Sequence, residues 1–443
     1  MFHLPEDVKF IIDKLTEYGY EAYAVGGCVR DTLLVRMPGD WDITTSAKPE
    51  QVKAIFSHTI DTGIQHGTVT VMRNHIGYEV TTYRIDGEYE DARHPKEVIF
   101  TGSLIEDLKR RDFTINAMAY NDKTGLVDEF NGTGDLEQKV IRCVGNPMAR
   151  FSEDALRMLR AVRFSAQLGF SIEENTKEAI RKLAPTIAKV SAERIATELI
   201  KILVSDHPEE IKTAYELGLT HIFLPEFDMM METPQNTKHH MYTVGEHTIE
   251  SLKNIPADKI MRLSMLFHDI AKPQCHTIDE KGSHFHGHPQ MGVEKCKRIM
   301  RRLKLDNDTI DKVARMVRYH DERPMLSKPV KVRTLISNVG MNDFPMLLAV
   351  KRADTLAQSL YHRDEKLQYI KELEAFYQDV LENAICVQKK DLAINGKDLI
   401  GMGMKQGKEL GDVLEELYQA VLNEPKLNKK EILLELASKK KTF

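Results

Sequence analysis

Two aspartates separated by one residue, Asp40 and Asp42, stand in a short segment that continues as Ile43-Thr44. Side chains alternate along a strand, so a strand here would place both carboxylates on one face, where they can share divalent cations. Two cations held in this way suit phosphoryl transfer, because one lowers the pKa of an attacking hydroxyl while the other steadies a leaving pyrophosphate. The alternative is an ordinary polar loop, since an isolated Asp-x-Asp is common.

A glycine pair precedes these aspartates. The run from Ala22 to Asp31 has the pattern of a buried strand, a Gly-Gly turn and the start of a helix. Gly26 and Gly27 let backbone N–H groups approach a phosphate closely, and Arg30 adds positive charge at the helix start. A Gly-Gly turn is by itself most often only a turn, but the aspartate pair at this distance makes the combination specific.

Two further groups of charged residues could serve the same chemistry. Glu79 falls in an expected neighbouring strand and is a candidate third carboxylate; the alternative is an outward-facing glutamate in an ion pair. Asp154 and Arg157 are three residues apart in an expected helix, which places their Cβ atoms roughly 5 to 6 Å apart on one face. By itself this spacing favours a simple ion pair. Arg160 and Arg163 continue the basic edge of that helix.

Histidines and aspartates in the second half of the chain follow the order H…HD…D. Imidazole and carboxylate ligands suit a divalent transition metal or Mg²⁺, and an adjacent His-Asp pair presents two ligands from one helix. The alternative is a helical domain kept for packing or RNA contact. The expected ligands are His247, His268, Asp269 and Asp354, with His288 and His320 between them as candidates for a second metal.

The elements that must position these groups change character along the chain. Short β-rich runs around Tyr23–Val25, Trp41–Thr45, Thr68–Met72 and Glu79–Tyr83 indicate a mixed α/β N-terminal part. From about Phe151 onward, apolar residues recur with the period of a helix. The chain is therefore predicted to be α+β, with strands near the N-terminus and helices over most of the rest.

Composition indicates a globular protein with several domains. The chain has 443 residues, of which 42% are hydrophobic and 29% charged, which excludes a disordered chain or a fibre. No stretch approaches 18 uncharged apolar residues and no signal peptide is visible, so we expect a cytoplasmic protein without a membrane segment. Five cysteines without CxxC spacing indicate free thiols.

The overall charge disfavours indiscriminate binding to polyanions. Lys plus Arg is 62 and Asp plus Glu is 67, which gives a net charge of -5. Contact with nucleic acid must therefore use local patches. The segment from Glu294 to Arg333 offers one, with 13 basic and 6 acidic side chains and a local charge of +7. A solvated helical face is the alternative.

Several short motifs follow one another between about residues 20 and 205. They are Gly26-Gly27-Cys28-Val29-Arg30-Asp31, Asp40-Trp41-Asp42-Ile43-Thr44, Asp86-Gly87-Glu88-Tyr89 to Arg93-His94-Pro95, Arg110-Arg111-Asp112-Phe113-Thr114-Ile115-Asn116-Ala117, Glu153-Asp154-Ala155-Leu156-Arg157 and Ser191-Ala192-Glu193-Arg194. In this order they resemble the class II tRNA nucleotidyltransferases, which are the bacterial CCA-adding enzymes and their poly(A) polymerase relatives.

The resemblance implies an enzyme that adds C, C and A to the 3′ end of tRNA from CTP and ATP without a nucleic-acid template. It implies that Asp40 and Asp42 bind catalytic Mg²⁺ and activate the 3′-hydroxyl of tRNA. Asp112 belongs to a motif linked to sugar recognition, and Arg160 and Arg163 are given supporting roles. The implied nucleotide-binding residues are Gly26, Gly27, Arg30, Arg111, Asp112, Asp154, Arg157, Arg160 and Arg163.

The resemblance also implies how the protein selects the base. Asp154 would accept from the exocyclic amine of cytosine or adenine while Arg157 donates to the adjacent ring acceptor. Uracil and guanine present a carbonyl in place of the amine, and each unmet buried group costs roughly 1 to 3 kcal/mol. The segment from Asp86 to Pro95 matches a flexible loop that CC-only relatives lack, which favours a switch from C to A.

The setting of the His-Asp pair resembles a second family. The runs His240 to His247 and Leu263 to Pro273 are similar to the HD phosphohydrolase superfamily. The resemblance implies an additional phosphomonoesterase or 2′,3′-cyclic phosphodiesterase activity that needs a divalent metal, whose identity the sequence leaves open. Two rival readings remain: a relative of partial specificity, adding only CC, only A or poly(A), and an HD phosphohydrolase whose N-terminal module is not catalytic.

Together these observations predict four domains and leave the oligomeric state open. We expect a palm-like nucleotidyltransferase head over residues 1–145 and a helical neck with the base-selection site over 146–227. An HD domain is expected over 228–365 and a helical tail that binds tRNA over 366–443.

Overall fold

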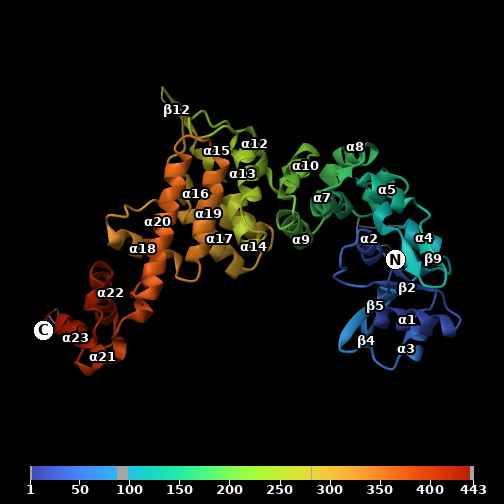
Figure 1. Cartoon of the computed structure of the whole chain (residues 1–443), viewed down its shortest axis with the longest axis horizontal. Coiled ribbons are helices and arrows are strands. Elements are labelled where there is room, and N and C mark those ends of the chain that lie inside the picture. Colours follow the sequence, from blue (N-terminus) through green and yellow to red (C-terminus); the bar gives the residue numbers. More distant parts are fainter. Residues whose placement is uncertain (1, 87–97, 281, 440–443) are drawn as a thin grey trace. The chain divides into compact units, whose positions relative to one another are not determined.

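A seven-stranded sheet lies at the centre of the first of two units in the computed structural model, which describes residues 2–86, 98–280 and 282–439. This unit spans Met1–Pro225 (Figure 1). The strand order is β3-β4-β5-β2-β1-β8-β9. The strands are β1 (Ala22–Val25), β2 (Ile43–Thr45), β3 (Thr59–Gly63), β4 (Thr68–Arg73), β5 (Ile76–Thr82), β8 (Ala119–Asn121) and β9 (Gly125–Val127).

The two central strands bring the aspartate segment to one end of the sheet. β2 runs antiparallel to β1 and parallel to β5. The expectation that Asp40 and Asp42 lie within a strand is wrong, because β2 begins one residue later, at Ile43. The reason is that β1 ends at Val25, whose N–H still donates to the carbonyl of Asp42 at 3.0 Å. The chain then turns away at Gly26, where φ is +82°.

Helices and short strand pairs complete the first unit. α7 and α9 pack against each other and bury the apolar faces that the helical period predicts. The short strands are β6 (Arg84–Asp86) with β7 (Val98–Phe100) and β10 (Val140–Ile141) with β11 (Ser171–Ile172). The helices are α1 (Glu6–Glu17), α2 (Gly27–Leu33), α3 (Pro49–Ile55), α4 (Leu104–Lys109), α5 (Gly132–Gln138), α6 (Pro147–Glu153), α7 (Leu156–Leu168), α8 (Glu174–Leu183), α9 (Ala192–Leu203), α10 (Ile211–Glu216) and α11 (Thr220–Phe223).

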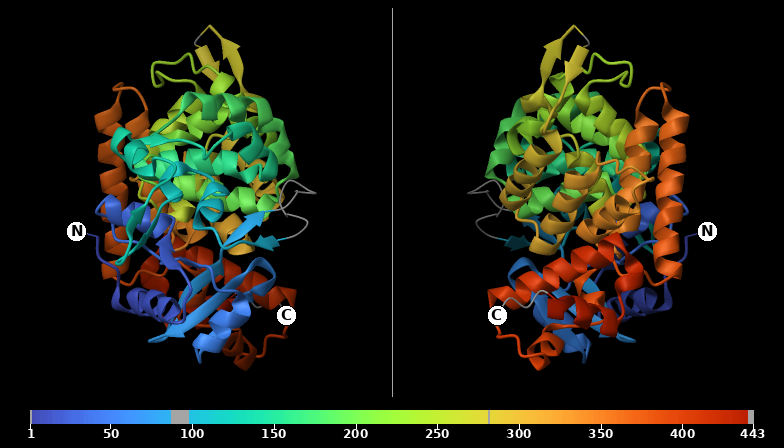
Figure 2. Two further views of the ribbon diagram at one scale, coloured as in Figure 1. Left: turned by 90° about the vertical axis from the view of Figure 1, so that its right-hand side faces the viewer. Right: turned by 90° about the vertical axis from the view of Figure 1, so that its left-hand side faces the viewer.

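The second unit, Glu226–Phe443, consists, in the residues that the structure describes, of helices, their connecting loops and one hairpin that stands out from the helices (Figure 2). The hairpin consists of β12 (Thr277–Asp279) and β13 (Gly282–His284). The helices are α12 (Pro225–Glu232), α13 (Val244–Lys253), α14 (Lys259–Phe267), α15 (Lys272–Cys275), α16 (His288–Arg302), α17 (Asn307–Tyr319), α18 (Pro329–Val339), α19 (Phe344–Ala357), α20 (Arg363–Glu382), α21 (Gly396–Gly401), α22 (Lys408–Asn423) and α23 (Lys430–Lys439).

Local capping sets where the central helices of this unit begin. The side chain of Thr243 accepts from the N–H of Glu246, whose carboxylate accepts from the N–H of Thr243, so α13 starts with a capping box. Asp258 caps α14 by accepting from two backbone N–H groups. α13 packs against α14 and α19, and α14 packs against α17. These contacts bring residues far apart in sequence to one buried centre.

The fold agrees with the predicted α+β class, with the large sheet near the N-terminus and helices beyond it. The finer division into domains at residues 145, 227 and 365 stays a prediction. None of the helices in the described ranges is long and apolar enough to cross a membrane.

Candidate active sites

Three carboxylates meet at the end of the large sheet. Ile43 pairs with Val80 in the parallel register of β2 and β5, so Asp42, just before β2, and Glu79, just before Val80 in β5, are neighbours. Although Asp42 is exposed, the protein around its carboxylate and the charges of Asp40 and Glu79 raise its pKa to about 6, against the effect of Arg111. A divalent cation would relieve this crowding, so the residues fit the predicted metal site.

The glycine turn lies directly against Arg111. A Cβ atom at Gly26 would lie 2.9 Å from Nη1 of Arg111, and the positive φ of this residue also favours glycine. Gly27 begins α2, and a Cβ there would lie 3.7 Å from Nη2 of Arg30. The structure therefore brings together four of the residues that were expected to hold phosphates: the two glycines and the two arginines.

Asp107 holds Arg111 in place, and Asp107 was not among the residues predicted from the sequence. Its carboxylate is fully buried and lies 2.8 Å from Nη2 of Arg110 and 3.5 Å from Nη2 of Arg111. It also accepts from the hydroxyl of Thr44 at 3.2 Å and from the N–H of Arg84 at 3.3 Å. Burial opposes the charge of Asp107, but the two arginines outweigh it and lower its pKa. The sequence did contain a signal for this network. Asp107 stands three residues before Arg110 and four before Arg111, and these spacings favour ion pairs along a helix.

A second buried network surrounds Asp112. Arg30 donates to the side chain of Asn116 at 2.7 Å, and Asn116 donates to Asp112 at 3.2 Å. Arg160 donates to the other carboxylate oxygen at 2.7 Å. Burial raises the pKa of Asp112, but its pairing with Arg160 outweighs this effect and holds the pKa at about 2. Asp112 and Arg160 thus bind each other, and the sugar-binding role of Asp112 stays a prediction.

The expectation that Asp154 and Arg157 lie on one helix is wrong, while their joint role in base selection stays a prediction. α6 ends at Glu153 and α7 begins at Leu156, so Asp154 lies at a break between two helices. One of its oxygens accepts from the N–H of Leu156, the first residue of α7, at 3.0 Å, and the other lies 2.7 Å from Nη2 of Arg194. The backbone of Asp154 is extended, which is incompatible with a continuous helix through this residue.

Arg157 and Arg163 take other partners. Nη1 of Arg157 lies 2.7 Å from an oxygen of Glu153, one helical turn earlier. Nε of Arg163 lies 3.0 Å from an oxygen of Glu198 on α9, and its guanidinium stacks 4.0 Å from the ring centroid of Phe164. Burial lowers the pKa of Arg163 to about 10. Arg163 therefore joins α7 to α9, and its role in nucleotide binding stays a prediction.

The segment from Asp86 to Pro95 lies, after Asp86, outside the described residues. Its match to the flexible loop of the family stays a prediction.

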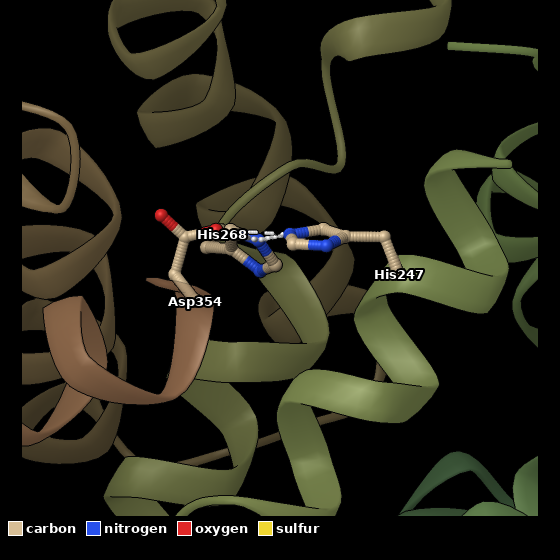
Figure 3. Close-up of side chains that lie close together, drawn as sticks. All are labelled: His247, His268 and Asp354. Carbon is tan, nitrogen blue, oxygen red and sulfur yellow. Dashed lines mark hydrogen bonds and ion pairs between the residues drawn. The ribbon is translucent and has the colours of Figure 1, made fainter. Parts of the chain in front are cut away.

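Four histidines and two aspartates meet inside the second unit. His247 comes from α13, His268 directly follows α14 and Asp354 comes from α19 (Figure 3). Asp269 is the next residue after His268. Nε2 of His247 lies 2.9 Å from Oδ1 of Asp354 and 3.3 Å from Nε2 of His268. The side chains of His247, His268, Asp269 and Asp354 are all buried. His247, His268 and Asp354 thus form a set of three ligand atoms close enough to hold one metal ion.

Asp269 connects this set to a second one. Its Oδ2 lies 3.1 Å from Nε2 of His268, while its Oδ1 lies 3.3 Å from Nε2 of His288 and 3.7 Å from Nε2 of His320. The two histidines of the second set lie 3.3 Å apart between their Nε2 atoms. His288 and His320, which the sequence offered only as candidates, therefore complete a second set of three ligands with Asp269.

Backbone carbonyls determine which nitrogen of each ring faces the centre. Nδ1 of His268, His288 and His320 lies 2.7, 2.8 and 2.8 Å from the carbonyl oxygens of residues 265, 285 and 317 respectively. A carbonyl only accepts, so Nδ1 carries the hydrogen and Nε2 of a neutral ring presents its lone pair to the centre. Neither oxygen of Asp269 has a hydrogen-bond partner of good geometry. Converging lone pairs and a buried carboxylate fit a pair of divalent cations.

The electrostatics of the centre also favour positive charge. Burial lowers the pKa of His268, but Asp269 and Asp354 outweigh it and raise the pKa above the usual value. Nζ of Lys272 lies 2.7 Å from Oδ2 of Asp269. A cavity of about 590 Å³ opens onto Asp269, Asp354 and His320, and its walls also carry Lys272, Arg323 and Lys366. The cavity therefore suits an anionic group beside the centre.

The buried network around Asp107 predicts a large loss of stability when its charge is removed. Asp107→Asn leaves two arginines without their buried partner, and we expect the free energy of unfolding of the first unit to fall by about 3 to 5 kcal/mol. Urea denaturation with separate probes for the two units measures it. The control is Glu106→Gln, a partly exposed neighbour on α4 that pairs only with the surface residue Lys109 among the ion pairs described, and its change costs less than about 0.5 kcal/mol. Equal stability of the two variants would contradict the role of Asp107.

Sequence comparison matches three regions of the chain to known domains. Residues 22–142 match the poly A polymerase head domain, and residues 169–231 match a region described as a probable RNA and SrmB-binding site of polymerase A. Residues 286–437 match tRNA nucleotidyltransferase domain 2. The first region contains the carboxylates at the end of the sheet, and the third contains His288, His320 and Asp354.

Whole proteins match over nearly their full length. The CCA-adding enzyme of Limosilactobacillus reuteri is 36% identical over 97% of this chain and 95% of its own, and that of Ligilactobacillus salivarius is 34% identical over 99% and 98%. The crystal structure of the Bacillus stearothermophilus CCA-adding enzyme in complex with CTP is 30% identical, with a TM-score of 0.72 over 97% of this chain and 96% of that one. The Thermotoga maritima CCA-adding enzyme complexed with tRNA shares the fold, with 22% identity and a TM-score of 0.59. The matched domains and these full-length relatives place the chain among the CCA-adding enzymes, which are nucleotidyltransferases of the poly(A) polymerase family.

Proposed function

We propose that Asp40 and Asp42 carry out the nucleotidyl transfer of this enzyme by holding two Mg²⁺ ions. The main support is the meeting of Asp40, Asp42 and Glu79, which raises the pKa of Asp42 to about 6 and leaves a place for cations. When bound, Mg²⁺ supplies a Lewis acid for the attacking hydroxyl and for the leaving pyrophosphate. The carboxylates of Asp40 and Asp42 would determine where the Mg²⁺ ions bind.

The substrates follow from the family and from the residues beside the carboxylates. The 3′-oxygen of tRNA forms a bond to the α-phosphorus of CTP or ATP, the bond to the β-phosphate breaks, and pyrophosphate leaves while the hydroxyl proton passes to solvent. Arg30, Arg111 and the turn at Gly26 and Gly27 hold the triphosphate. The CTP in the structure of the Bacillus stearothermophilus relative supports this assignment. We also propose a cytoplasmic location, where tRNA and nucleotides are at hand.

Base selection is assigned to Asp154 and Arg157. The guanidinium of Arg194 and the N–H of Leu156 each donate to one oxygen of Asp154, so the carboxylate is held in a defined orientation. Each oxygen keeps a further lone pair that can accept from an exocyclic amine. Arg157 is anchored to Glu153 and to the carbonyl of Arg110, which Nη2 meets at 3.0 Å. Rigid partners of this kind make the rejection of a wrong base costly, since the base cannot be accommodated by moving them.

The buried centre of the second unit supports a second activity. We assign it to the metal-dependent hydrolysis of phosphate esters, with His247, His268, Asp269 and Asp354 as ligands and with His288 and His320 completing the second metal. The observation that carries this proposal is the bridging position of Asp269 between two histidine pairs. Bound divalent cations would supply Lewis acids for water and for a phosphoryl oxygen. Lys272, paired with Asp269 at the cavity wall, holds the bridging carboxylate in its charged form.

Replacing either aspartate at the end of the sheet tests the transfer site. Asp40→Asn and Asp42→Asn each remove a metal ligand, and we expect the rate of nucleotide addition to fall at least about a thousandfold. The measurement is extension of tRNA transcripts that end at the discriminator base, after one C or after two Cs, with CTP, ATP or both. Asp269→Ala is the matched control and should extend the transcripts like the wild-type chain. Normal addition by either Asn variant would refute the assignment.

The base-selection assignment predicts a different defect. Asp154→Ala removes the acceptor for the exocyclic amine, so the preference for C and A over U and G should fall by about 5- to 100-fold, while C addition to a preformed end slows less. Competition between CTP and UTP on one transcript measures the preference. Arg194→Ala, which frees one oxygen of Asp154 but keeps the acceptor, should have a smaller effect. An equal loss of rate with all four nucleotides would contradict a templating role.

Removal of the bridging carboxylate tests the second centre. Asp269→Ala removes the carboxylate between the two histidine sets, and we expect less divalent metal to be bound per chain than in the wild type, with loss of metal-dependent phosphatase activity. Metal analysis after dialysis and a phosphate-release assay are the measurements. Asp42→Asn should keep both properties. Phosphatase activity at the wild-type level in Asp269→Ala would exclude this centre as its source.

A further inference from the structure

Three guanidinium groups gather around the ring of Phe164, a residue of α7 that is 5% exposed. The Cζ atom of each guanidinium lies over this ring, at 5.1 Å from the ring centroid for Arg30, 5.5 Å for Arg160 and 4.0 Å for Arg163. Arg160 and Arg163 belong to α7 itself, whereas Arg30 comes from α2, which begins at the glycine turn. We call these four residues the arginine–phenylalanine cluster.

The charges of the cluster explain why an aromatic ring lies at its centre. Each arginine has a carboxylate partner, which is Asp31 for Arg30, Asp112 for Arg160 and Glu198 for Arg163. The cations still repel one another: burial lowers the pKa of Arg163, and the charge of Arg160 adds to this effect. The face of an aromatic ring carries partial negative charge and attracts cations. Phe164 thus offsets the repulsion, and unlike a further carboxylate it adds no net negative charge that would repel a phosphate.

The ring of Phe164 is itself held by a second buried ring. Phe113 meets it with the centroids 5.7 Å apart and the planes at 80°, which is an edge-to-face contact. The N–H of Phe113 donates to one carboxylate oxygen of Asp112 at 2.9 Å, and Arg160 donates to the other at 2.7 Å. The two rings and the buried network around Asp112 therefore support each other.

Arg30 connects the cluster to the turn that is proposed to hold the triphosphate. Its Nη1 donates to the side chain of Asn116 at 2.7 Å, and a Cβ atom at Gly27 would lie 3.7 Å from its Nη2. The guanidinium of Arg30 thus lies between the ring of Phe164 and the glycine turn. Without the attraction of the ring this guanidinium could shift, which would weaken its hold on a triphosphate but would leave Asp40 and Asp42 in place.

We propose that Phe164 is a positioning residue for nucleotide binding, because its ring holds the guanidinium of Arg30 beside the glycine turn together with those of Arg160 and Arg163. This inference rests on the proposed triphosphate site. It adds a residue that acts through the arginines and not on the nucleotide directly, and it names the attraction between ring and cations as the interaction that orders them.

Graded fluorination of the ring tests this role in the full-length chain. Phe164 is replaced by 4-fluoro-, 3,5-difluoro- and 3,4,5-trifluorophenylalanine, which nearly keep the shape of the ring while each fluorine weakens its attraction for a cation. In extension of transcripts that end at the discriminator base, the KM for CTP should rise stepwise, by about 3- to 30-fold for the trifluoro ring, while kcat changes less than about twofold. The same series at Phe113, a buried ring over which none of the described contacts places a guanidinium, is the matched control and should leave the KM within about twofold.

The outcomes separate this inference from the site on which it rests. A KM that stays constant across the series at Phe164, or a rise that the series at Phe113 equals, overturns the role of the ring. Failure of the triphosphate site has another signature, since Arg30→Gln, checked for folding by circular dichroism, then has the KM of the wild-type chain for CTP. In that case the ring has no triphosphate-binding arginine to position, and the inference is overturned together with the site. A raised KM in Arg30→Gln with a constant KM across the fluorine series keeps the site and rejects the ring alone.

Discussion

A carboxylate that is buried away from water must be surrounded by positive charge or by N–H and O–H donors, and this requirement organises the functional part of each unit. In the first unit Asp107 and Asp112 meet it with arginines, so that Arg110, Arg111 and Arg160 are held in fixed positions. In the second unit Lys272 supplies positive charge to Asp269, while the nitrogens of three histidines face the same carboxylate with their lone pairs. The folded chain supplies enough positive charge in the first case and leaves room for metal ions in the second.

Local patterns predicted much of both sites. Three features depend only on residues that are close in sequence: the Gly-Gly turn, the aspartate pair and the His-Asp pair. For such residues the spacing along the chain largely determines how they lie relative to one another. The α+β class followed from the change from strand-like to helical periodicity near Phe151. His288 and His320 were recognised as candidates from residue type alone, but nothing in the sequence indicated that Asp269 would lie between them and the other histidines.

Contacts between distant residues account for what was missed or wrong. Asn116 joins Arg30 across 86 residues, and Arg194 takes the carboxylate of Asp154 across 40 residues. The helical period expected from the sequence continues past Asp154, so the pattern hid the helix break at this residue, where the backbone is extended and the carboxylate pairs with Arg194. β2 starts late because its neighbour β1 ends at Val25, which is a property of the pair of strands and not of either segment.

The close approach of Arg111 to Gly26 also limits how this enzyme can evolve. A side chain at position 26 would displace the guanidinium, and that movement would take Arg111 away from Asp107, which in turn accepts from Thr44 in β2. One added methyl group would thus alter contacts in α4 and in β2 as well as in the turn. The positive φ at position 26 adds backbone strain for any other residue, so this turn favours glycine for two independent reasons.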